Sequence, residues 1–245
     1  VCDEWCLPDH GIWEVRGAPR HYVHSKVMAW VALDRAVRMA AQFGLEGDVA
    51  RWRYSRAKVK AAVLEQGYDA TMGAFVQSFG STALDAANLL IPIVEFLPFD
   101  DPRVQGTISA TLRHLTVDGI VYRYLNDDGL PGDEGAFGLT TFWLVEALAL
   151  SGRTAEAREL FAAMAARANH LGLYSEEFDP RTGEMLGNFP QAFTHIGFVN
   201  AALYLAREEG KPTPEPAPLG SREHRAEGRR KERRGSAGPG ADAPG

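Results

Sequence analysis

The chain contains little cysteine and no long apolar run. Its 245 residues include two cysteines, Cys2 and Cys6, both within the first six positions. The two further nearby ligands that a zinc site would need are missing, as are a phosphate-binding loop and a nucleophile triad, so we expect no metal and no cofactor. The apolar runs are too short for a membrane span, so no membrane partner is expected. A secretory signal is also missing, but the chain does not begin with Met, so localisation stays open with the cytoplasm slightly favoured.

Charge is distributed unevenly along the chain. The formal net charge is −6, yet residues 211–245 hold eight Lys and Arg against five Asp and Glu. The other 210 residues are therefore acidic, which argues against nucleic acid as their main partner. The basic end has twelve Gly and Pro among 35 residues and almost no apolar side chains. We predict a folded region over residues 1–210 and a disordered tail over residues 211–245.

The folded region contains an internal repeat. Four openings, at spacings of 56, 52 and 53 residues, begin at Gly11, Gly67, Gly119 and Gly172. A sparsely charged helical pattern follows each opening, at residues 24–43, 83–97, 137–151 and 191–206. The first three are followed by a second helical pattern, at residues 48–66, 102–115 and 153–169. The sequence therefore predicts seven helices, most of them in hairpins.

The charge content of the two helix classes predicts how they are layered. The helices after the openings carry four, two, one and no charged residues, as expected where protein surrounds a helix on most sides. Two of the three helices in the second class are much more charged, which is typical of a surface helix. Hairpins of this kind pack side by side, and a closed ring explains the difference better than an open solenoid. Pro92 is expected to kink the second inner helix.

The repeat also brings polar residues into register. It superposes four of them in the loops before the inner helices: Glu14, Asp69, Arg123 and Glu176. Such loops emerge at one end of the fold, so these side chains should share one mouth. In a ring of six hairpins the first and fourth lie opposite each other, so Glu14 and Glu176 would face across that mouth. Two opposed carboxylates, with an Arg and aromatic rings nearby, are suited to glycoside hydrolysis with inversion.

Each of these residues also has a simpler interpretation. A Glu near a helix N-terminus commonly caps the helix or interacts with its dipole. Arg123 could be a surface ion-pair partner, and Trp13 and Tyr122 could be core residues. Their coincidence at equivalent repeat positions favours a functional site. A different class of function stays open, namely a catalytically inactive α-hairpin module that binds carbohydrate or protein through the same mouth.

Long motifs extend over about residues 5–208: GIWEVRG with PRHYVHSKVMAWVALDRA, GAFVQSFGS with ALDAANLL, DDPRVQGTI, DGIVYRYLNDDGLPGDEGAF with FWLVEALALSGR, and SEEFDPRTGEMLGNFPQAFTHIGFVNAAL. Together they resemble the C-terminal part of the catalytic domain of glycoside hydrolase family 15, the family of glucoamylases and bacterial trehalase-like enzymes. The resemblance implies an all-α fold, the (α/α)6 barrel or six-hairpin toroid, present here as a partial barrel of about seven helices. The missing N-terminal part of the same enzyme would then complete the ring.

The resemblance also implies roles for individual residues. The family's general acid follows a Trp and falls on Glu14. Its general base falls on Glu176 in the motif SEEFD. An Arg that holds sugar hydroxyls falls on Arg123 in VYRY.

Two positions depart from the family pattern. Glu177 stands where the family usually has Gln. Val15, followed by Arg16, stands where fungal glucoamylases have a second acidic residue, which resembles the bacterial trehalase-like branch. Glu134 is a rival for the base, although it could instead cap the next helix. The candidate substrate-binding residues are Trp13, Arg16, His24, Tyr122, Arg123, Glu134 and Glu177.

The sequence thus predicts an exo-acting, inverting α-glucosidase of glucoamylase or trehalase type. Its substrate would be an α-glucan oligosaccharide or trehalose, and glucose would be released. No cofactor is required for an inverting mechanism with two carboxylates. The isolated chain is expected to be inactive, because an incomplete ring exposes helix faces and lacks part of the sugar pocket.

Overall fold

A computed structural model describes residues 1–126 and 135–214 of the chain. The chain divides into two compact units, Val1–Lys211 and Pro212–Gly245. Residues 215–245 lie outside the described part, so the disordered tail expected there stays a prediction. The first unit holds α1 (Val23–Phe43), α2 (Val49–Gln66), the 3-10 helix η1 (Ala86–Leu89), α3 (Leu90–Ile93), α4 (Pro102–His114), α5 (Gly138–Leu150), α6 (Thr154–Ala165) and α7 (Ala192–Glu208).

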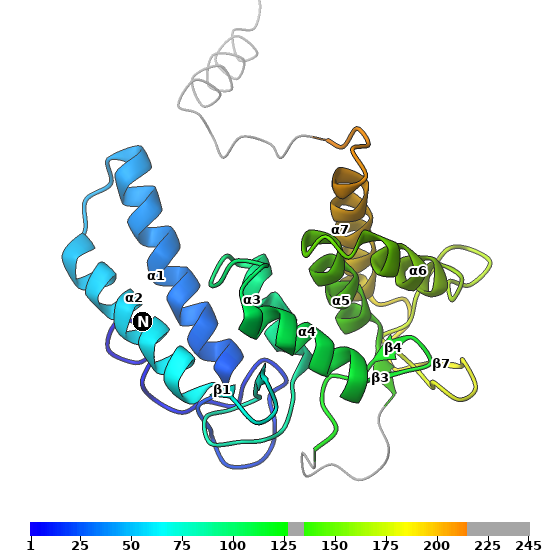
Figure 1. Cartoon of the computed structure of the whole chain (residues 1–245), viewed down its shortest axis with the longest axis horizontal. Helices are drawn as coiled ribbons and strands as arrows, with labels where there is room; N and C mark the ends of the chain where they lie inside the picture. Colours follow the sequence, from blue (N-terminus) through cyan, green and yellow to red (C-terminus); the bar gives the residue numbers. More distant parts are fainter. Residues whose placement is uncertain (127–134, 215–245) are drawn as a thin grey trace, which may run out of the picture. The chain divides into compact units, whose positions relative to one another are not determined.

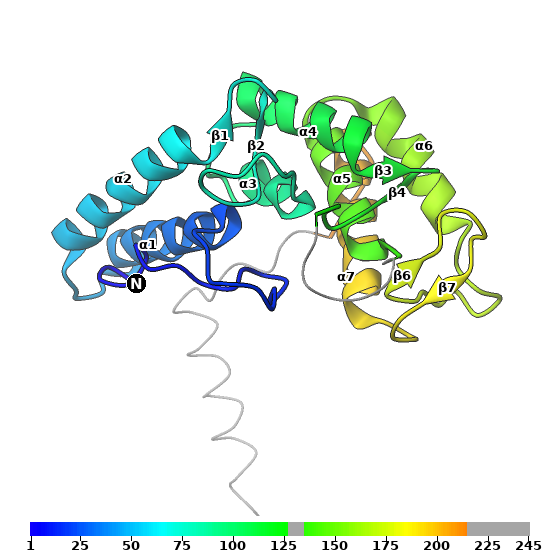
Figure 2. The same ribbon diagram turned by 90° about the horizontal axis from the view of Figure 1, so that it is seen from below.

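The helices of the first unit pack as neighbouring hairpins. Figures 1 and 2 show α1 beside α2, and α5 packed with both α6 and α7. The short α3 contacts both α1 and α5. Ten of the 13 residues of α5 are buried, against three of 18 in α2 and two of 12 in α6. The predicted difference between inner and outer helices is therefore confirmed for these elements.

Capping side chains mark where the outer helices α2 and α4 begin. The Asp48 side chain accepts a hydrogen bond from the Arg51 N–H at the start of α2. Asp101 does the same for the Arg103 N–H at the start of α4, where Pro102 is the first helical residue. A short polar acceptor before a helix satisfies a free N–H group, and Pro is tolerated at the first position because its missing N–H would be unpaired there.

The second inner helix is much shorter than the sequence predicts. Instead of one kinked helix over residues 83–97, the structure has η1 followed by α3, which ends at Ile93. Asp85 is extended, with φ −142°, and caps η1 through the Ala87 N–H. After Pro92 the chain turns sharply, because Glu95 adopts a left-handed φ of 65°. The Pro therefore lies in the last turn of a short helix.

The repeat openings contain small antiparallel hairpins that the sequence analysis treats as loops. The strands are β1 (Tyr68–Asp69), β2 (Ala74–Phe75), β3 (Thr116–Val117), β4 (Ile120–Val121), β5 (Ala136–Phe137), β6 (Glu177–Phe178) and β7 (Met185–Leu186). They pair as β1–β2, β3–β4 and β5–β6–β7. The third sheet joins the loop before α5 to the loop before α7, so two openings are hydrogen-bonded to each other.

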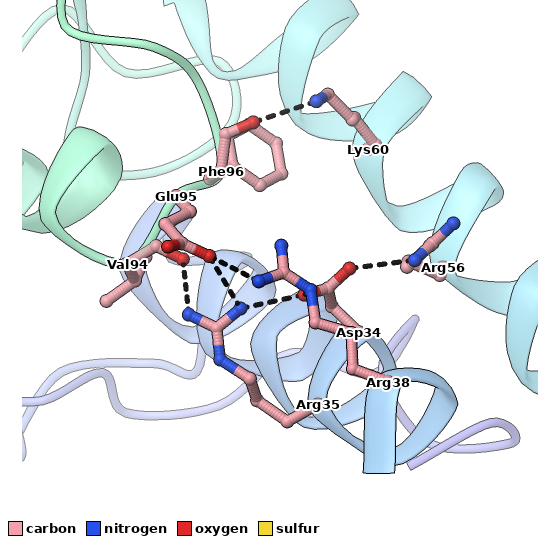
Figure 3. A network of polar contacts seen from close by, with 8 residues as sticks. All are labelled: Asp34, Arg35, Arg38, Arg56, Lys60, Val94, Glu95 and Phe96. Carbon is pink, nitrogen blue, oxygen red and sulfur yellow. Dashed lines mark hydrogen bonds and ion pairs between the residues drawn. The ribbon is translucent and has the colours of Figure 1, made fainter. Parts of the chain in front are cut away.

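A buried carboxylate ties α1 to α2 (Figure 3). Asp34 on α1 is 3% exposed, and its Oδ1 accepts from Arg56 NH1 of α2 at 2.7 Å. Its Oδ2 accepts from Arg35 NH1 at 2.7 Å and from Arg38 Nε at 2.8 Å. The same two arginines reach Glu95 beyond α3, at 3.2 Å and 2.6 Å. This network joins the first hairpin to the segment after α3.

Replacement of this carboxylate should destabilise the first hairpin. We expect Asp34→Ala to lower the free energy of unfolding by about 2–3 kcal/mol, because three guanidinium groups lose a charged acceptor. The arginine side chains are between 32% and 52% exposed, so water can replace part of the loss. Urea denaturation of the protein at its full natural length measures the change. Glu46→Ala, at an exposed position, is the control and should change stability by less than about 0.5 kcal/mol. Equal effects of the two variants would contradict a stabilising role.

One face of α7 is apolar and open. Phe193, Ile196 and Val199 are 61%, 53% and 52% exposed. They recur at every third residue and so share one face of the helix. The lack of charge over residues 191–206 predicts a helix covered on most sides, but within the described residues this face has no such cover.

Cys2 and Cys6 are free thiols. Across residues 1–126 and 135–214, no helix is long and apolar enough to cross a membrane. In the same residues, no group of three or more His, Cys, Asp or Glu side chains is arranged to hold a metal ion.

Candidate active site

Residues from three of the four repeat openings lie together with the indole of Trp13, and the segment after the second opening contributes Asp85. The group consists of Trp13, Asp85, Arg123, Phe137, Trp143 and Glu177, called the Trp13 cluster below. Trp13 belongs to the first opening, Arg123 to the third and Glu177 to the fourth, while Asp85 follows the second. These contacts join the first opening to the third and the third to the fourth, and the roles predicted for their residues stay predictions.

The indole of Trp13 is held on several sides. Its ring centroid lies 5.8 Å from that of Phe137, edge to face, and 6.1 Å from that of Trp143. The guanidinium of Arg123 lies 5.5 Å from the indole centroid. The indole Nε1–H donates to both carboxylate oxygens of Asp85, at 3.0 Å and 3.1 Å. The ring is thus fixed by packing, a cation–π contact and hydrogen bonds together.

Asp85 is the buried acceptor at the base of this cluster. The residue is 5% exposed, and it also accepts from Gln77 Nε2 at 3.2 Å and from the Ala87 N–H at 2.8 Å. Burial raises the pKa of Asp85 to about 6, while these donors and the charge of Arg123 oppose the rise. The carboxylate is therefore mainly ionised at neutral pH, with a donor at each oxygen.

Arg123 connects the aromatic side of the cluster to its acidic side. Its guanidinium carbon lies 5.2 Å from the ring centroid of Phe137, and its NH2 lies 3.6 Å from Glu177 Oε1. The backbone carbonyl of Arg123 accepts from the Ala86 N–H at 2.9 Å. The neighbouring Tyr122 is half-buried against the apolar core. Arg123 is thus held by both its side chain and its main chain.

Glu176 precedes Glu177 and has one carboxylate oxygen fixed. Its Oε2 accepts from the Asn188 N–H at 3.0 Å and from Asn188 Nδ2 at 2.8 Å. Within the described residues, its Oε1 accepts no hydrogen bond. Gly187 has φ 71°, and a Cβ there would lie 2.8 Å from Glu176 Oε2. The glycine therefore leaves the space that this carboxylate occupies.

Glu14 lies in a turn, nine residues before the start of α1. Helix α1 begins at Val23, with Tyr22 as its N-cap, so the capping interpretation of Glu14 does not hold. Glu14 is exposed and has a positive φ of 53°. Left-handed backbone in a residue other than Gly costs about 1–3 kcal/mol and is often found at functional sites.

The contacts that define the Trp13 cluster do not include Arg16 or His24. Arg16 is exposed, two residues beyond Glu14. His24 is half-buried in the first turn of α1, and burial lowers its pKa to about 4, against a smaller opposing effect of Asp9. It is therefore neutral at physiological pH. Glu134 lies outside the described residues.

The proposed register is wrong at its second position. The carboxylate of Asp69 accepts from the Thr71 and Met72 N–H groups, so it stabilises the β1–β2 turn rather than contacting the cluster. Asp85, which follows the second opening, contacts the cluster instead, and sequence reasoning missed it. The available signal was its position, since it is one of only two charges within residues 83–97. Trp143 was missed because an aromatic residue on an apolar helix is commonly a core residue.

Comparisons with known proteins identify relatives of this chain. A family model described as glycosyl hydrolases family 15 matches residues 1–203. A trehalase from Thermoplasma volcanium is 47% identical over 199 residues, which are 81% of this chain and 32% of that protein. A trehalase from Mycobacterium tuberculosis is 48% identical over 208 residues, which are 84% of this chain and 30% of that protein. The chain therefore spans about a third of the length of these relatives.

Solved structures show the same fold at lower sequence identity. A glycosidase variant in complex with glucose has a TM-score of 0.71 at 24% identity, over 86% of this chain and 58% of that chain. A glucoamylase from Saccharomycopsis fibuligera has a TM-score of 0.69 at 13% identity, over 86% of this chain and 60% of that chain. The fold is the (α/α)6 barrel, of which the described residues contribute seven α-helices. From the family match and these likenesses, the chain is a member of glycosyl hydrolase family 15.

Proposed function

We propose that this chain carries the two catalytic carboxylates of an exo-acting, inverting α-glucosidase. Glu14 is the general acid, Glu176 is the general base and Arg123 holds the hydroxyls of the terminal glucose. Trehalose is the first substrate to test, because the relatives at 47% and 48% identity are trehalases. An α-glucan oligosaccharide, cleaved as by a glucoamylase, is the second.

One observation carries the proposal most directly. Each proposed carboxylate directly adjoins a residue of the Trp13 cluster, since Glu14 follows Trp13 and Glu176 precedes Glu177. Arg123 lies between those two cluster residues, 5.5 Å from the indole centroid and 3.6 Å from Glu177 Oε1. Two carboxylates beside aromatic rings and a guanidinium match the needs of glycoside hydrolysis.

The proposed mechanism uses the two carboxyl groups in opposite protonation states. Protonated Glu14 gives its proton to the glycosidic oxygen as the bond from that oxygen to the anomeric carbon breaks. Glu176 takes a proton from a water molecule, which attacks the anomeric carbon from the other face and inverts it. Its Oε2 is held by Asn188, so Oε1 is the oxygen that receives the proton.

Other side chains would bind the sugar. The planar guanidinium of Arg123 offers paired donors to adjacent hydroxyls, and aromatic rings such as Trp13 and Tyr122 pack against sugar faces. The remaining proposed substrate-binding residues are Arg16, His24, Glu134 and Glu177. The inverting mechanism requires no cofactor.

Glucose release tests this function. The protein at its full natural length is incubated with trehalose, maltose and isomaltose, and the anomer formed first is followed by NMR. We expect glucose, with the β-anomer appearing first from the newly hydrolysed side of the α-bond. Retained α-configuration would contradict inversion. Sugar binding without glucose release would favour the alternative, a catalytically inactive α-hairpin module.

The open face of α7 supports the further proposal that an N-terminal part of the same enzyme completes the barrel. Phe193, Ile196 and Val199 give this face the apolar character of a packing surface. The relatives are about three times as long as the matched region. The isolated chain is therefore expected to release little or no glucose, and a folded, active, monomeric chain of 245 residues would contradict this.

Arg123→Lys should weaken substrate binding more than it slows the reaction. Lysine keeps the charge but loses the paired donors, so we expect KM for trehalose to rise about 10-fold or more. Arg158→Lys is the matched control, because Arg158 is 62% exposed and pairs with Glu209 at the surface. Steady-state kinetics of both variants measure the effect. An unchanged KM for Arg123→Lys would remove the sugar-binding role.

A further inference from the structure

Asp85 makes more contacts than its local structure requires. As the N-cap of η1, it needs only Oδ1, which accepts from the Ala87 N–H at 2.8 Å. Asn or Ser could supply one such acceptor without a buried charge. A buried carboxylate is costly unless several donors compensate it, and here the additional donors come from outside the helix. The charge therefore serves something other than the cap.

The additional donors come from two other loops. Trp13 Nε1, 72 residues away in sequence, donates to both oxygens, and Gln77 Nε2 donates to Oδ2. The Gln77 carbonyl in turn accepts from the Val23 N–H at the start of α1, at 3.0 Å. Asp85 thus links the turn before α1 to the loop that supports the first residue of that helix.

The same segment holds the residue proposed to bind the sugar. The Ala86 N–H donates to the Arg123 carbonyl at 2.9 Å, and the charges of Asp85 and Arg123 attract each other. The guanidinium of Arg123 also lies against the indole that Asp85 holds. One short segment therefore sets the position of the indole and that of the guanidinium.

We infer that Asp85 is a positioning residue for the general acid, acting through the indole of Trp13. This inference rests on the proposed function, in which Glu14 is the acid. Glu14 is bonded directly to Trp13 and makes no side-chain hydrogen bond within the described residues. Its position therefore depends on the anchored residue before it. Small displacements of a catalytic group can lower the rate about 100-fold.

The test compares two substrates that differ in their need for an acid. The leaving group of trehalose is a glucose, whose oxygen requires a proton. The leaving group of α-glucosyl fluoride is fluoride, which needs little protonation. For Asp85→Asn in the protein at its full natural length, we expect kcat on trehalose to fall about 10- to 100-fold. The rate on α-glucosyl fluoride should fall at least several-fold less. A structural defect alone would lower both rates together.

Two other variants make the test specific. Trp13→Phe keeps a ring but removes the Nε1–H, so it should reproduce the preferential loss on trehalose. The double variant should then lose little more than either single variant, because both substitutions change the same contact between the Nε1–H and the carboxylate. Asn88→Ala is the control, since Asn88 is buried in the same helix and its side-chain Nδ2 donates to the Val76 carbonyl rather than to Asp85. It should leave the ratio of the two rates unchanged.

The outcomes separate this inference from the proposed function. Equal losses on both substrates, or additive effects of Asp85→Asn and Trp13→Phe, would overturn the positioning role. If Asp85→Asn does not fold, the Trp13→Phe variant tests the inference by itself. An unchanged ratio of its rates on trehalose and α-glucosyl fluoride would overturn the inference. Glu14→Gln retaining activity on trehalose would instead overturn the assignment of the acid itself.

Discussion

Glu14→Gln should lower kcat/KM for trehalose about 1,000-fold, because glutamine cannot supply a proton to the leaving oxygen. General acid catalysis commonly contributes about 100- to 10,000-fold. The side chain is exposed and caps no helix, so stability should change little. Steady-state glucose release by the protein at its full natural length measures the effect, with thermal unfolding measured in parallel.

The leaving group identifies the role of Glu14. With α-glucosyl fluoride the variant should keep most of its activity, since fluoride departs with little help from an acid. Glu46→Gln, which changes an exposed Glu between α1 and α2, is the control and should behave like the unmodified protein. Equal loss on both substrates would show that Glu14 is not the acid.

Glu176→Gln is expected to abolish turnover of both substrates. Attack by water needs a base whatever group leaves, so we predict a loss of about 1,000-fold or more on trehalose and on α-glucosyl fluoride alike. Glutamine can still accept the two hydrogen bonds from Asn188 through its remaining oxygen. Glucose binding, measured by calorimetry, should therefore persist.

A neighbouring carboxylate provides the control for this second experiment. Glu184→Gln, at an exposed position between β6 and β7, should leave the activity unchanged. Activity of Glu176→Gln close to that of the unmodified protein would move the base role to Glu134, and Glu134→Gln would then be the next variant. The contrast between Glu14→Gln and Glu176→Gln on α-glucosyl fluoride thus distinguishes the acid from the base.

The repeat, rather than any single motif, predicted that the loop openings lie together. Its spacing superposes Glu14, Asp69, Arg123 and Glu176, and the contacts of neighbouring residues join the first, third and fourth openings. Helix ends were also predictable where capping chemistry is local, as at Asp48 and Asp101. The helix ends depend on residues within one turn, and the repeat depends on a regular spacing. Both can be read directly from the sequence.

The length of the second inner helix was not predictable in the same way. The pattern over residues 83–97 is apolar enough for one helix, but the chain instead turns at Glu95 and buries Phe96 completely. Glu95 then pairs with Arg35 and Arg38 on α1. Contacts between distant segments decided this ending, and periodicity within one segment carries no information about them.

The sequence by itself determined the family, the order of the helices and the pair of carboxylates to test. Only the tertiary structure decided that Asp85 takes the place expected for Asp69, that Glu14 lies in a strained turn, and that one face of α7 stays open. The physical reason is the same in each case. Burial and hydrogen bonding depend on which parts of the chain meet, as the indole of Trp13 meets the Asp85 carboxylate 72 residues away. A pattern along the sequence shows which surfaces can pack, but it does not show which of them pack together.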